Sequence, residues 1–443
     1  MSIKKSLVKY PFLTQDVEVY KLESGHTIVL AHKEGGLVNV SSWVKTGSIN
    51  EDEKNNGISH FLEHLMFKGT HKHKAGDFDR ILEAKGAIVN AATWKDYTFY
   101  YVTLPKGEKD KDFYQAIELH ADMMIDPILP EEEIGAEFDV KDTNVKDKRE
   151  RHVVIEEIRM RQDQPWTKVY NACNRAMYTE HPYKRDVIGT PEIISQVSQK
   201  EIMNYYRTFY TPENITTIIV GEFDNEVVLN KVMAEFNFEG RKNTPVKANK
   251  IDPPITETKY IEQKSQINSA FMMFGYLGPI AKDLKKTIAL EMLSIILGDG
   301  SSSRLYQNLI EKQKEPIFNM INAEHYQFKD GDNFFIQANF RPEKKDLALE
   351  LVKKELENLQ TGFVLENEFL KTKKKIKSKF AYNAETVSEI GDTIGYYMTV
   401  CDDLSLVEDY LEMLEEITIE DLQKTAQEYL NLDNATISVL LPE

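Results

Sequence analysis

Three ionisable side chains stand close together in the segment GISHFLEHLMFKGT, residues 57–70. On a helix His60 and His64 are one turn apart, so their imidazoles share a face and can reach a single cation. Imidazoles bind Zn²⁺ at about 2.0–2.1 Å, which makes zinc the expected metal, one ion per chain. Glu63 lies beside such a metal rather than on it, where a carboxylate can take a proton from water.

The same segment carries the signals of a buried helix. Asn55 or Asn56 is the expected N-cap, and Gly69 suits the stop. Apolar residues surround the histidines on nearly every side of the helix. Buried histidines and a buried glutamate cost several kcal/mol unless partners or a metal satisfy them. The competing interpretation is two core histidines bonded to backbone carbonyls.

A third ligand is expected, because catalytic zinc sites usually combine three protein ligands with water. The segment RERHVVIEEIRMRQ offers two adjacent candidates, Glu156 and Glu157. On a helix Glu157 shares a face with Glu150 and Val154, whereas Glu156 shares a polar face with His152. We therefore expect Glu157 to point inward as the ligand. Glu150 is expected to orient the ligands without binding the metal itself. The alternative for an inward glutamate is an ion pair with an arginine.

Three further histidines are not assigned to the metal. His71 and His73 lie in HKHK, which is typical of an exposed loop, and His181 has no assigned role beyond loop structure.

Composition bounds the class of protein. The chain has 443 residues, 41% hydrophobic and 29% charged, which is typical of a globular protein of two or more domains. A net charge of −17 argues against nucleic acid as a partner. The two cysteines, Cys173 and Cys401, exclude a disulfide framework and favour a reducing compartment. Without a secretory h-region or a membrane-length apolar run, the expected location is the cytoplasm.

The chain contains what we interpret as two copies of one unit. VSQKEIMNYYRTFYTPENITTIIVGEF from Val197 aligns with ITIEDLQKTAQEYLNLDNATISVLLPE from Ile417 at an offset of 220 residues. Each copy predicts a capped helix, a turn with an Asn, and a strand of β-branched residues. The alternative is coincidence between two ordinary helix–strand units. We predict a zinc-bearing domain at 1–237, a polar linker at 238–257 and a homologous domain without zinc ligands at 258–443.

The fold class is α+β, with mostly antiparallel sheets backed by helices. The first copy predicts a hairpin around Ser24-Gly25, a strand in VNVSSWVKTGS, and two strands in NAAT and YTFYYVTL. Its expected helices cover 57–68, 77–85, 113–126 and 134–163. The second copy predicts strands at 269–275 and 333–339, and helices at 282–297 and near 304–312.

At these residues the sequence resembles the pitrilysin/insulysin family of inverted-motif (HxxEH) zinc peptidases, in particular half-size members such as the mitochondrial processing peptidase subunits. The resemblance rests on HFLEH, ERHVVIEE, NAAT with DYTFYYVTLP, HPYKRDVIGTPE and SSRLYQNL, and it spans nearly the whole chain. It implies that His60, His64 and Glu157 are zinc ligands, that Glu63 is the general base and that Glu150 supports them. It also implies that a peptide substrate adds as a strand near Asn90, Ala91 and Ala92.

Two departures from the family pattern bear on function. The interval between the histidines and Glu157 is longer than usual, with the extra residues in GAEFDVKDTNVKDK, expected as a helix extension or surface loop. Many active members carry an Arg and a Tyr seven residues apart in the domain that lacks zinc, whereas Ile310 and Ile317 stand at the matching positions here. The expected function is a zinc metalloendopeptidase, a homodimer or a heterodimer with a zinc-less subunit that supplies the Arg/Tyr pair. The alternative is a catalytically inactive zinc-binding subunit that binds peptide or serves assembly.

Overall fold

The computed structural model describes residues 3–136, 138, 140–141, 149–238, 240–241, 248–362 and 364–443. These residues form two compact units, and neither unit is contiguous in sequence. Unit 1 comprises Met1–Arg159, Asp186–Ala248 and Phe380–Glu408; unit 2 comprises Met160–Arg185, Asn249–Lys379 and Asp409–Glu443. The predicted domain limits stay a prediction, and the compact units cut across them.

Unit 1 is built on a seven-stranded sheet with the order β1-β2-β3-β7-β4-β6-β5. All neighbours are antiparallel except β3 and β7. The central strand β7, ITTIIVG, is buried along its whole length, as expected of a β-branched strand covered on both faces. The strands are β1 (Ile3–Val8), β2 (Val17–Leu22), β3 (Thr27–His32), β4 (Leu37–Val44), β5 (Ile88–Thr93), β6 (Thr98–Pro105) and β7 (Ile215–Gly221).

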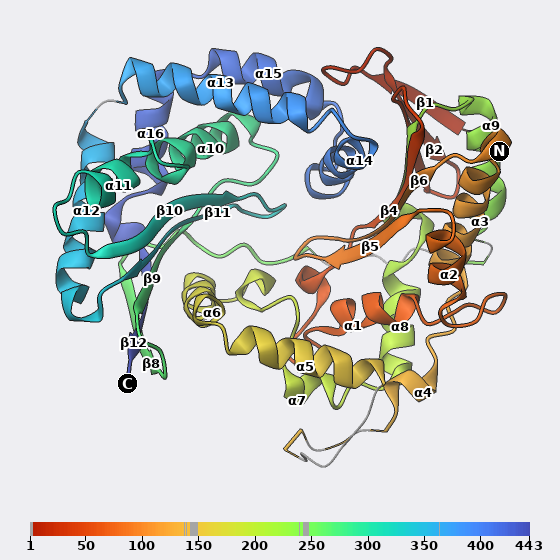
Figure 1. Cartoon of the computed structure of the whole chain (residues 1–443), viewed down its shortest axis with the longest axis horizontal. Coiled ribbons are helices and arrows are strands. Elements are labelled where there is room, and N and C mark those ends of the chain that lie inside the picture. The colour runs from red at the N-terminus through yellow and green to blue at the C-terminus, as the bar shows by residue number, and fades with distance from the viewer. Residues whose placement is uncertain are drawn as a thin grey trace. The chain divides into compact units, whose positions relative to one another are not determined.

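Helices cover both faces of this sheet (Figure 1). On one face α3 packs against β4 and β6, and α9 packs against β3; on the other, α14 packs against β4 and β7. The alternation of β4 explains the two contacts, because Val38 and Val40 enter the apolar core while Asn39 and Trp43 approach α14. The helices are α1 (Ile58–Met66), α2 (Asp77–Glu83), α3 (Lys111–Ile125), α4 (Glu131–Ile134), α5 (Glu150–Gln162), α7 (Pro191–Ile194), α8 (Gln199–Phe209), α9 (Asn225–Glu235) and α14 (Val387–Tyr396).

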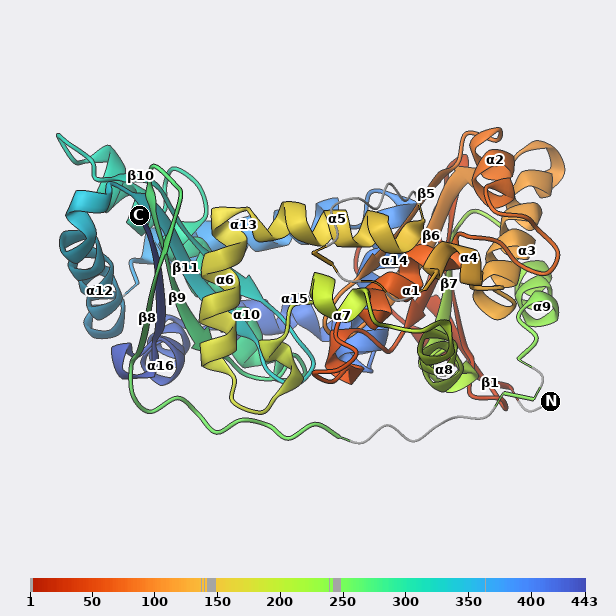
Figure 2. The same ribbon diagram turned by 90° about the horizontal axis from the view of Figure 1, so that it is seen from below.

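Unit 2 repeats this plan with a five-stranded sheet, β10-β11-β9-β12-β8, in which only β12 and β8 are parallel. Here α10 packs against β10 and β11, while α6 packs against β9 and β12 (Figure 2). The strands are β8 (Lys259–Ser265), β9 (Ala270–Leu277), β10 (Phe318–Tyr326), β11 (Asn333–Phe340) and β12 (Thr436–Pro442). The helices are α6 (Pro165–Met177), α10 (Leu284–Gly298), α11 (Arg304–Tyr306), α12 (Lys345–Thr361), α13 (Glu366–Tyr382), α15 (Leu406–Glu416) and α16 (Ile419–Tyr429).

The predicted repeat is visible in the elements. The bounds of α8 and α16 differ by the predicted 220 residues, and each helix leads through a 3-10 turn into the strand parallel to a neighbour, β7 or β12. Both helices begin with a capping box, Ser198 with Glu201 and Thr418 with Asp421. The two copies therefore share local chemistry as well as topology.

Three predicted elements need comment. The hairpin around Ser24-Gly25 is confirmed as β2 and β3. The single helix expected at 134–163 is wrong: α4 ends at Ile134, Gly135 follows with a φ of 68°, and α5 begins only at Glu150. Most of the charged stretch between them, residues 137, 139 and 142–148, lies outside the described residues, so its expected form is not tested. The helix expected near 304–312 is a short α11 continued by a π-helical turn at Gln307–Glu311.

Within the described part of the chain, no helix combines the length and the apolar character needed to cross a membrane.

Candidate metal centre

The helix α1 starts on a buried carboxylate rather than on the expected asparagine. Its N-cap is Gly57 with a φ of 95°, and the N–H groups of Gly57 and Ser59 donate to Glu51 at 2.8 and 2.9 Å. Asn56 also donates to Glu51, at 2.8 Å, while Asn55 accepts a hydrogen bond from the backbone N–H of Asp52. The prediction of Asn55 or Asn56 as the cap is therefore wrong, because Glu51 reaches the free N–H groups from six to eight residues upstream.

The three expected metal ligands lie together in unit 1. α5 runs beside α1 (Figures 1 and 2), and the imidazole centroids of His60 and His64 are 4.8 Å apart. The Glu157 Oε2 atom lies 3.8 Å from Nε2 of His60 and 3.6 Å from Nε2 of His64. One ligand atom from each residue lies within 4.8 Å of the other two. Of the two adjacent glutamates, Glu157, which the sequence predicts to point inward, is the one that lies near the histidines.

The two separations from Glu157 are close to those of a tetrahedral metal site. Zinc–nitrogen and zinc–oxygen distances of about 2.1 Å put tetrahedral ligand atoms about 3.4 Å apart. The observed separations from Glu157, 3.6 and 3.8 Å, need only a small adjustment to reach that value. The side chains of His60, His64 and Glu157 are 12%, 21% and 36% exposed, so the cluster is open to a small molecule.

Glu150 holds one of the histidines from behind, as predicted. His64 Nδ1 lies 2.9 Å from Glu150 Oε1, which directs Nε2 of the same ring toward Glu157. Burial would raise the pKa of Glu150, but its hydrogen bonds with His64 and Lys68 hold that pKa below the usual value. Burial likewise opposes charge on His64, yet Glu150 and Glu157 raise its pKa to about 9. This excess of acidic groups favours a bound cation.

Glu63 lies in α1 beside the cluster and is only 8% exposed. Burial raises its pKa, the hydrogen bond from Thr93 and the charge of His64 lower it, and Glu157 raises it again. Thr93 Oγ1 donates to Glu63 Oε2 at 2.5 Å. A buried carboxylate of this kind can exchange a proton with water.

The residues expected to bind substrate lie on the strand at one edge of the sheet. Asn90, Ala91 and Ala92 belong to β5, which pairs with β6 on one side and is the last strand in the sheet order. Among the described residues, no other strand pairs with the outer edge of β5. An open edge of this kind can accept an extended peptide through main-chain hydrogen bonds.

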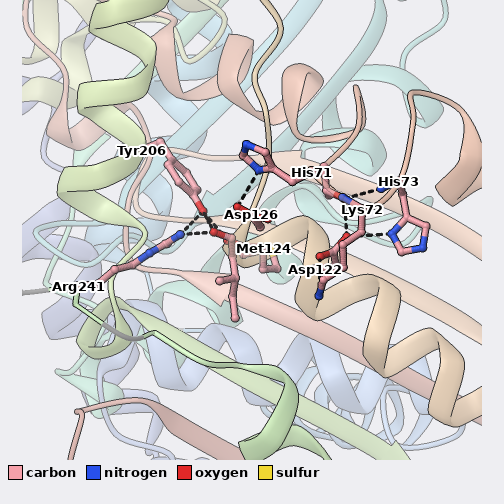
Figure 3. A network of polar contacts seen from close by, with 10 residues as sticks. His71, Lys72, His73, Asp122, Met124, Asp126, Tyr206 and Arg241 are labelled. Carbon is pink, nitrogen blue, oxygen red and sulfur yellow. Dashed lines mark hydrogen bonds and ion pairs between the residues drawn. The ribbon is translucent and has the colours of Figure 1, made fainter.

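The loop after α1 is fixed to the end of α3 by histidine–aspartate pairs (Figure 3). Nδ1 of His71 lies 2.9 Å from Asp126, and Nδ1 of His73 lies 2.9 Å from Asp122. Lys72 adds an ion pair with Asp122 at 3.3 Å. His71 is exposed as predicted, whereas His73 is half-buried. Neither lies in the cluster of His60, His64 and Glu157.

Two other histidines have structural partners. His152 was expected on a solvated face, which is wrong: its ring stacks on Phe138 with centroids 4.5 Å apart. In unit 2, His181 accepts a hydrogen bond from the backbone N–H of Tyr183 through Nδ1, and its Nε2 lies 3.2 Å from Asp330. His181 therefore ties the segment after α6 to the loop between β10 and β11.

The positions matching the family's Arg/Tyr pair are aliphatic in unit 2. Ile310 lies in the π-helical turn after α11, and Ile317 is buried just before β10. Neither side chain can donate a hydrogen bond to a substrate carbonyl.

Sequence reasoning missed three polar residues that support the site, Glu51, Lys68 and Thr93. Lys68 was detectable, because it follows His64 by one helical turn on the same face. Thr93 was detectable in part, because the alternation of β5 gives it the same face as Ala91. The hydrogen bond between Thr93 and Glu63 joins residues 30 positions apart, and no local pattern predicts it.

Comparison with known proteins agrees with this geometry. The family model Insulinase (Peptidase family M16) matches residues 27–191, and Peptidase M16 inactive domain matches residues 196–376. Zinc protease PqqE of Helicobacter pylori is 30% identical over 435 residues, which are 96% of this chain and 93% of that protein. This chain belongs to peptidase family M16. It consists of two tandem M16 domains in an α+β fold, and its relatives are named zinc proteases.

Solved structures of the family share the fold. A protease from Helicobacter pylori matches with a TM-score of 0.87 and 28% identity, over 99% of this chain and all (100%) of that one. The periplasmic protease PqqL from Escherichia coli matches with a TM-score of 0.76 and 17% identity, over 98% of this chain but 48% of that one. This chain thus spans about half of the length of PqqL.

Proposed function

We propose that this M16 chain is a zinc metallopeptidase that hydrolyses peptide bonds in extended peptides or precursor segments. The observation that carries the proposal is the convergence of His60, His64 and Glu157 in unit 1, with Glu63 beside them. These three residues would hold one zinc ion per chain. The names of the relatives, zinc proteases in several bacteria, support the choice of metal.

The chain's own residues divide the work of hydrolysis. A zinc ion held here would supply Lewis-acid activation of water and of the scissile carbonyl. Glu63 takes the proton from the attacking water and returns it to the leaving amine. The raised pKa that burial gives Glu63 suits both halves of that transfer. Glu150 keeps Nε2 of His64 turned toward Glu157 through the bond at Nδ1.

The substrate binds in this proposal as an added strand on β5, beside Asn90–Ala92. Main-chain pairing tolerates many sequences, which suits a peptidase that acts on extended peptides. The open outer edge of β5 and its proximity to Glu63 through Thr93 support this placement. The proposed location is the cytoplasm, in keeping with two buried free cysteines.

A partner chain is part of the proposal. Ile310 and Ile317 cannot replace the Arg/Tyr pair of active relatives, so a zinc-less family chain supplies that pair in a heterodimer. A homodimer is the alternative, and it would work without the pair. The length of PqqL, of which this chain covers 48%, supports assembly of two such chains. Addition of a zinc-less M16 subunit should raise peptide turnover above that of the isolated chain. Full turnover by the isolated chain would remove the need for a partner.

The two aliphatic residues also favour a second candidate, a zinc-binding subunit that binds peptide without cleaving it. Zinc content and peptide cleavage, measured together, separate the candidates. The second candidate binds stoichiometric zinc and peptide and never cleaves, alone or with a partner. A chain without stoichiometric zinc contradicts both.

The central experiment uses four variants of the full chain. Glu63→Gln should keep zinc and lose hydrolysis, whereas His64→Ala should lose both. Glu157→Gln should lose zinc, while Glu156→Gln is the matched control, because Glu156 is exposed and pairs with Arg159. Zinc is measured by atomic absorption and cleavage with a fluorogenic peptide library. Near-normal cleavage by Glu63→Gln would show that the base is assigned wrongly.

A further inference from the structure

The hydroxyl of Thr93 is the one hydrogen-bond donor to Glu63 among the described residues. Oγ1 of Thr93 lies 2.5 Å from Oε2 of Glu63, which is the length of a charge-assisted O–H···O⁻ bond. No hydrogen bond fixes Oε1 in the described part of the chain. One carboxylate oxygen is thus anchored, and the other is left for proton transfer.

The donor is itself held firmly. Thr93 pairs across the β5–β6 hairpin with Thr98, whose Oγ1 donates to the carbonyl of Thr46 at 2.9 Å and lies 3.5 Å from Oγ1 of Thr93. Threonine is β-branched, so few χ1 rotamers are open to it in a strand. A long glutamate side chain has several rotatable bonds, and a bond to a rigid donor selects one of its conformations.

We infer that Thr93 is a positioning residue that fixes the carboxylate of Glu63 relative to the strand on which substrate binds. Thr93 closes the segment Asn90–Thr93, so the same strand holds the base through a side chain and offers its free edge to the peptide. In this arrangement the single strand β5 fixes the positions of both the base and the scissile bond. The inference rests on the proposed peptidase function and adds a residue that the helix motif does not contain.

The size of the effect follows from geometry. A reacting group displaced by about 1 Å can lose about 100-fold in rate. Thr93→Val keeps the shape and the strand propensity of the side chain but removes the donor. We expect kcat to fall about 10- to 100-fold, with KM changed by less than about twofold, because Ala91 and the edge of β5 are untouched.

The test compares three variants of the full chain in the assembly that cleaves peptide. Thr93→Ser restores a hydroxyl and should return kcat to within about threefold of the wild type. Thr103→Val is the matched control: Thr103 lies on β6 of the same hairpin, and its hydroxyl accepts from Asn39 rather than bonding to Glu63. It should leave kcat unchanged. Zinc content and circular dichroism establish that each variant is folded and loaded.

The outcomes are distinct. A drop in kcat for Thr93→Val that Ser reverses, at constant KM and zinc content, supports the inference. Unchanged kcat in Thr93→Val, or a loss shared equally by Thr103→Val, overturns it. A rise in KM without a fall in kcat also overturns it, because it assigns Thr93 to the shape of β5. If wild-type chain and Glu63→Gln are equally inactive with every partner, the peptidase proposal itself has failed.

Discussion

The helices α1 and α10 occupy the same place in the two units and are built for different purposes. Each lies in sequence between a central strand and the edge strand, β4 and β5 in unit 1, β9 and β10 in unit 2. α10 is a 15-residue helix, LKKTIALEMLSIILG, and nearly all of it is buried. α1 has 9 residues and carries His60, Glu63 and His64 among its apolar side chains.

One fold thus carries a cluster of ionisable residues in one copy and an apolar core helix in the other. In unit 2 the helix gains stability from apolar burial, at about 25 cal/mol per Å². In unit 1 the same position holds ionisable groups with polar partners: Thr93 donates to Glu63, and Glu150 pairs with His64. The chemistry therefore belongs to the side chains placed on the fold, not to the fold itself.

Removal of metal should produce the largest difference in behaviour between the two units. A ligand that binds only the folded state at 1,000 times its Kd stabilises that state by about 4 kcal/mol. Chelation should therefore abolish cleavage and speed amide hydrogen exchange in α1 and α5. Exchange in α10 should not change. Equal changes in α1 and α10, measured by mass spectrometry, would contradict a metal site confined to unit 1.

Each sheet is also covered by a helix that is distant from it in sequence. The close approach of helix and sheet depends on glycines, but these lie on the helix in unit 1 and on the sheet in unit 2. On unit 1, Gly391 and Gly395 of α14 let the helix approach β4, and a Cβ on Gly395 would lie 2.0 Å from the indole of Trp43. On unit 2 the glycine is on the sheet instead: a Cβ on Gly275 would lie 2.5 and 2.7 Å from the sulfurs of Met177 and Cys173 of α6.

This difference predicts unequal costs for two identical substitutions. Gly395→Ala should lower the free energy of unfolding by about 3 kcal/mol, because Trp43 is stacked on Phe99 at 4.3 Å and cannot move aside. The gain in helix propensity, about 1 kcal/mol, is too small to compensate. Gly275→Ala should cost about 1 kcal/mol, since thioether and thiol side chains adapt.

Urea unfolding of both variants, with Gly36→Ala as the control, measures these costs. Nothing lies within 4 Å of a Cβ on Gly36, so the control should be nearly neutral. An equal cost for the two buried glycines would show that rigidity of the neighbour does not decide the outcome.

The buried histidines differ between the units as well. In unit 1, His26 and His120 bond through Nε2 to the hydroxyls of Thr217 and Ser42, at 2.9 and 3.0 Å. In unit 2, His325 lies 3.0 Å from the carboxylate of Asp332. Burial lowers the pKa of His26 and of His120 to about 3, so both stay neutral in the folded state.

Acid should therefore weaken unit 1 through these two groups. Between pH 6.5 and pH 3 the unfolded histidines bind protons and the folded ones do not, so stability falls as pH falls. At pH 5 each contributes a loss of about 2 kcal/mol relative to pH 8. His120→Leu should remove one such loss, whatever its cost at pH 8. An unfolding free energy with the same pH dependence in variant and wild type would show that His120 is not the titrating group.

Much of the site could be predicted from sequence because it depends on the spacing of residues within single helices. The spacing of His60 and His64 on one helix, and the choice of Glu157 over Glu156, need only the period of a helix. The cap of α1 was not predictable in this way, because Glu51 lies outside the helix and acts through a bend in the loop before it.

The packing of α14 on the sheet of unit 1 and of α6 on the sheet of unit 2 was not predictable either. The pattern Val169, Cys173, Met177 shows that α6 buries one face, but a period of four residues does not say against which sheet. The partners, β9 and β12, lie about 100 and 260 residues further along the chain. The repeat at 220 residues was visible only where both copies keep the same capping residues and turn.

The capping residues of α8 and α16 allow a direct test of the likeness between the two units, with a small expected effect on stability. In unit 1 the N–H of Glu201 donates to Ser198 Oγ at 3.3 Å, and in unit 2 the N–H of Asp421 donates to Thr418 Oγ1 at 3.1 Å. Ser198→Ala and Thr418→Ala should each cost about 1 kcal/mol of unfolding free energy. Because the two caps lie in different units, the double variant should cost the sum within about 0.5 kcal/mol. Urea unfolding of the single and double variants measures this sum. A large deviation from it would show that the two caps, and hence the two units, do not contribute independently to stability.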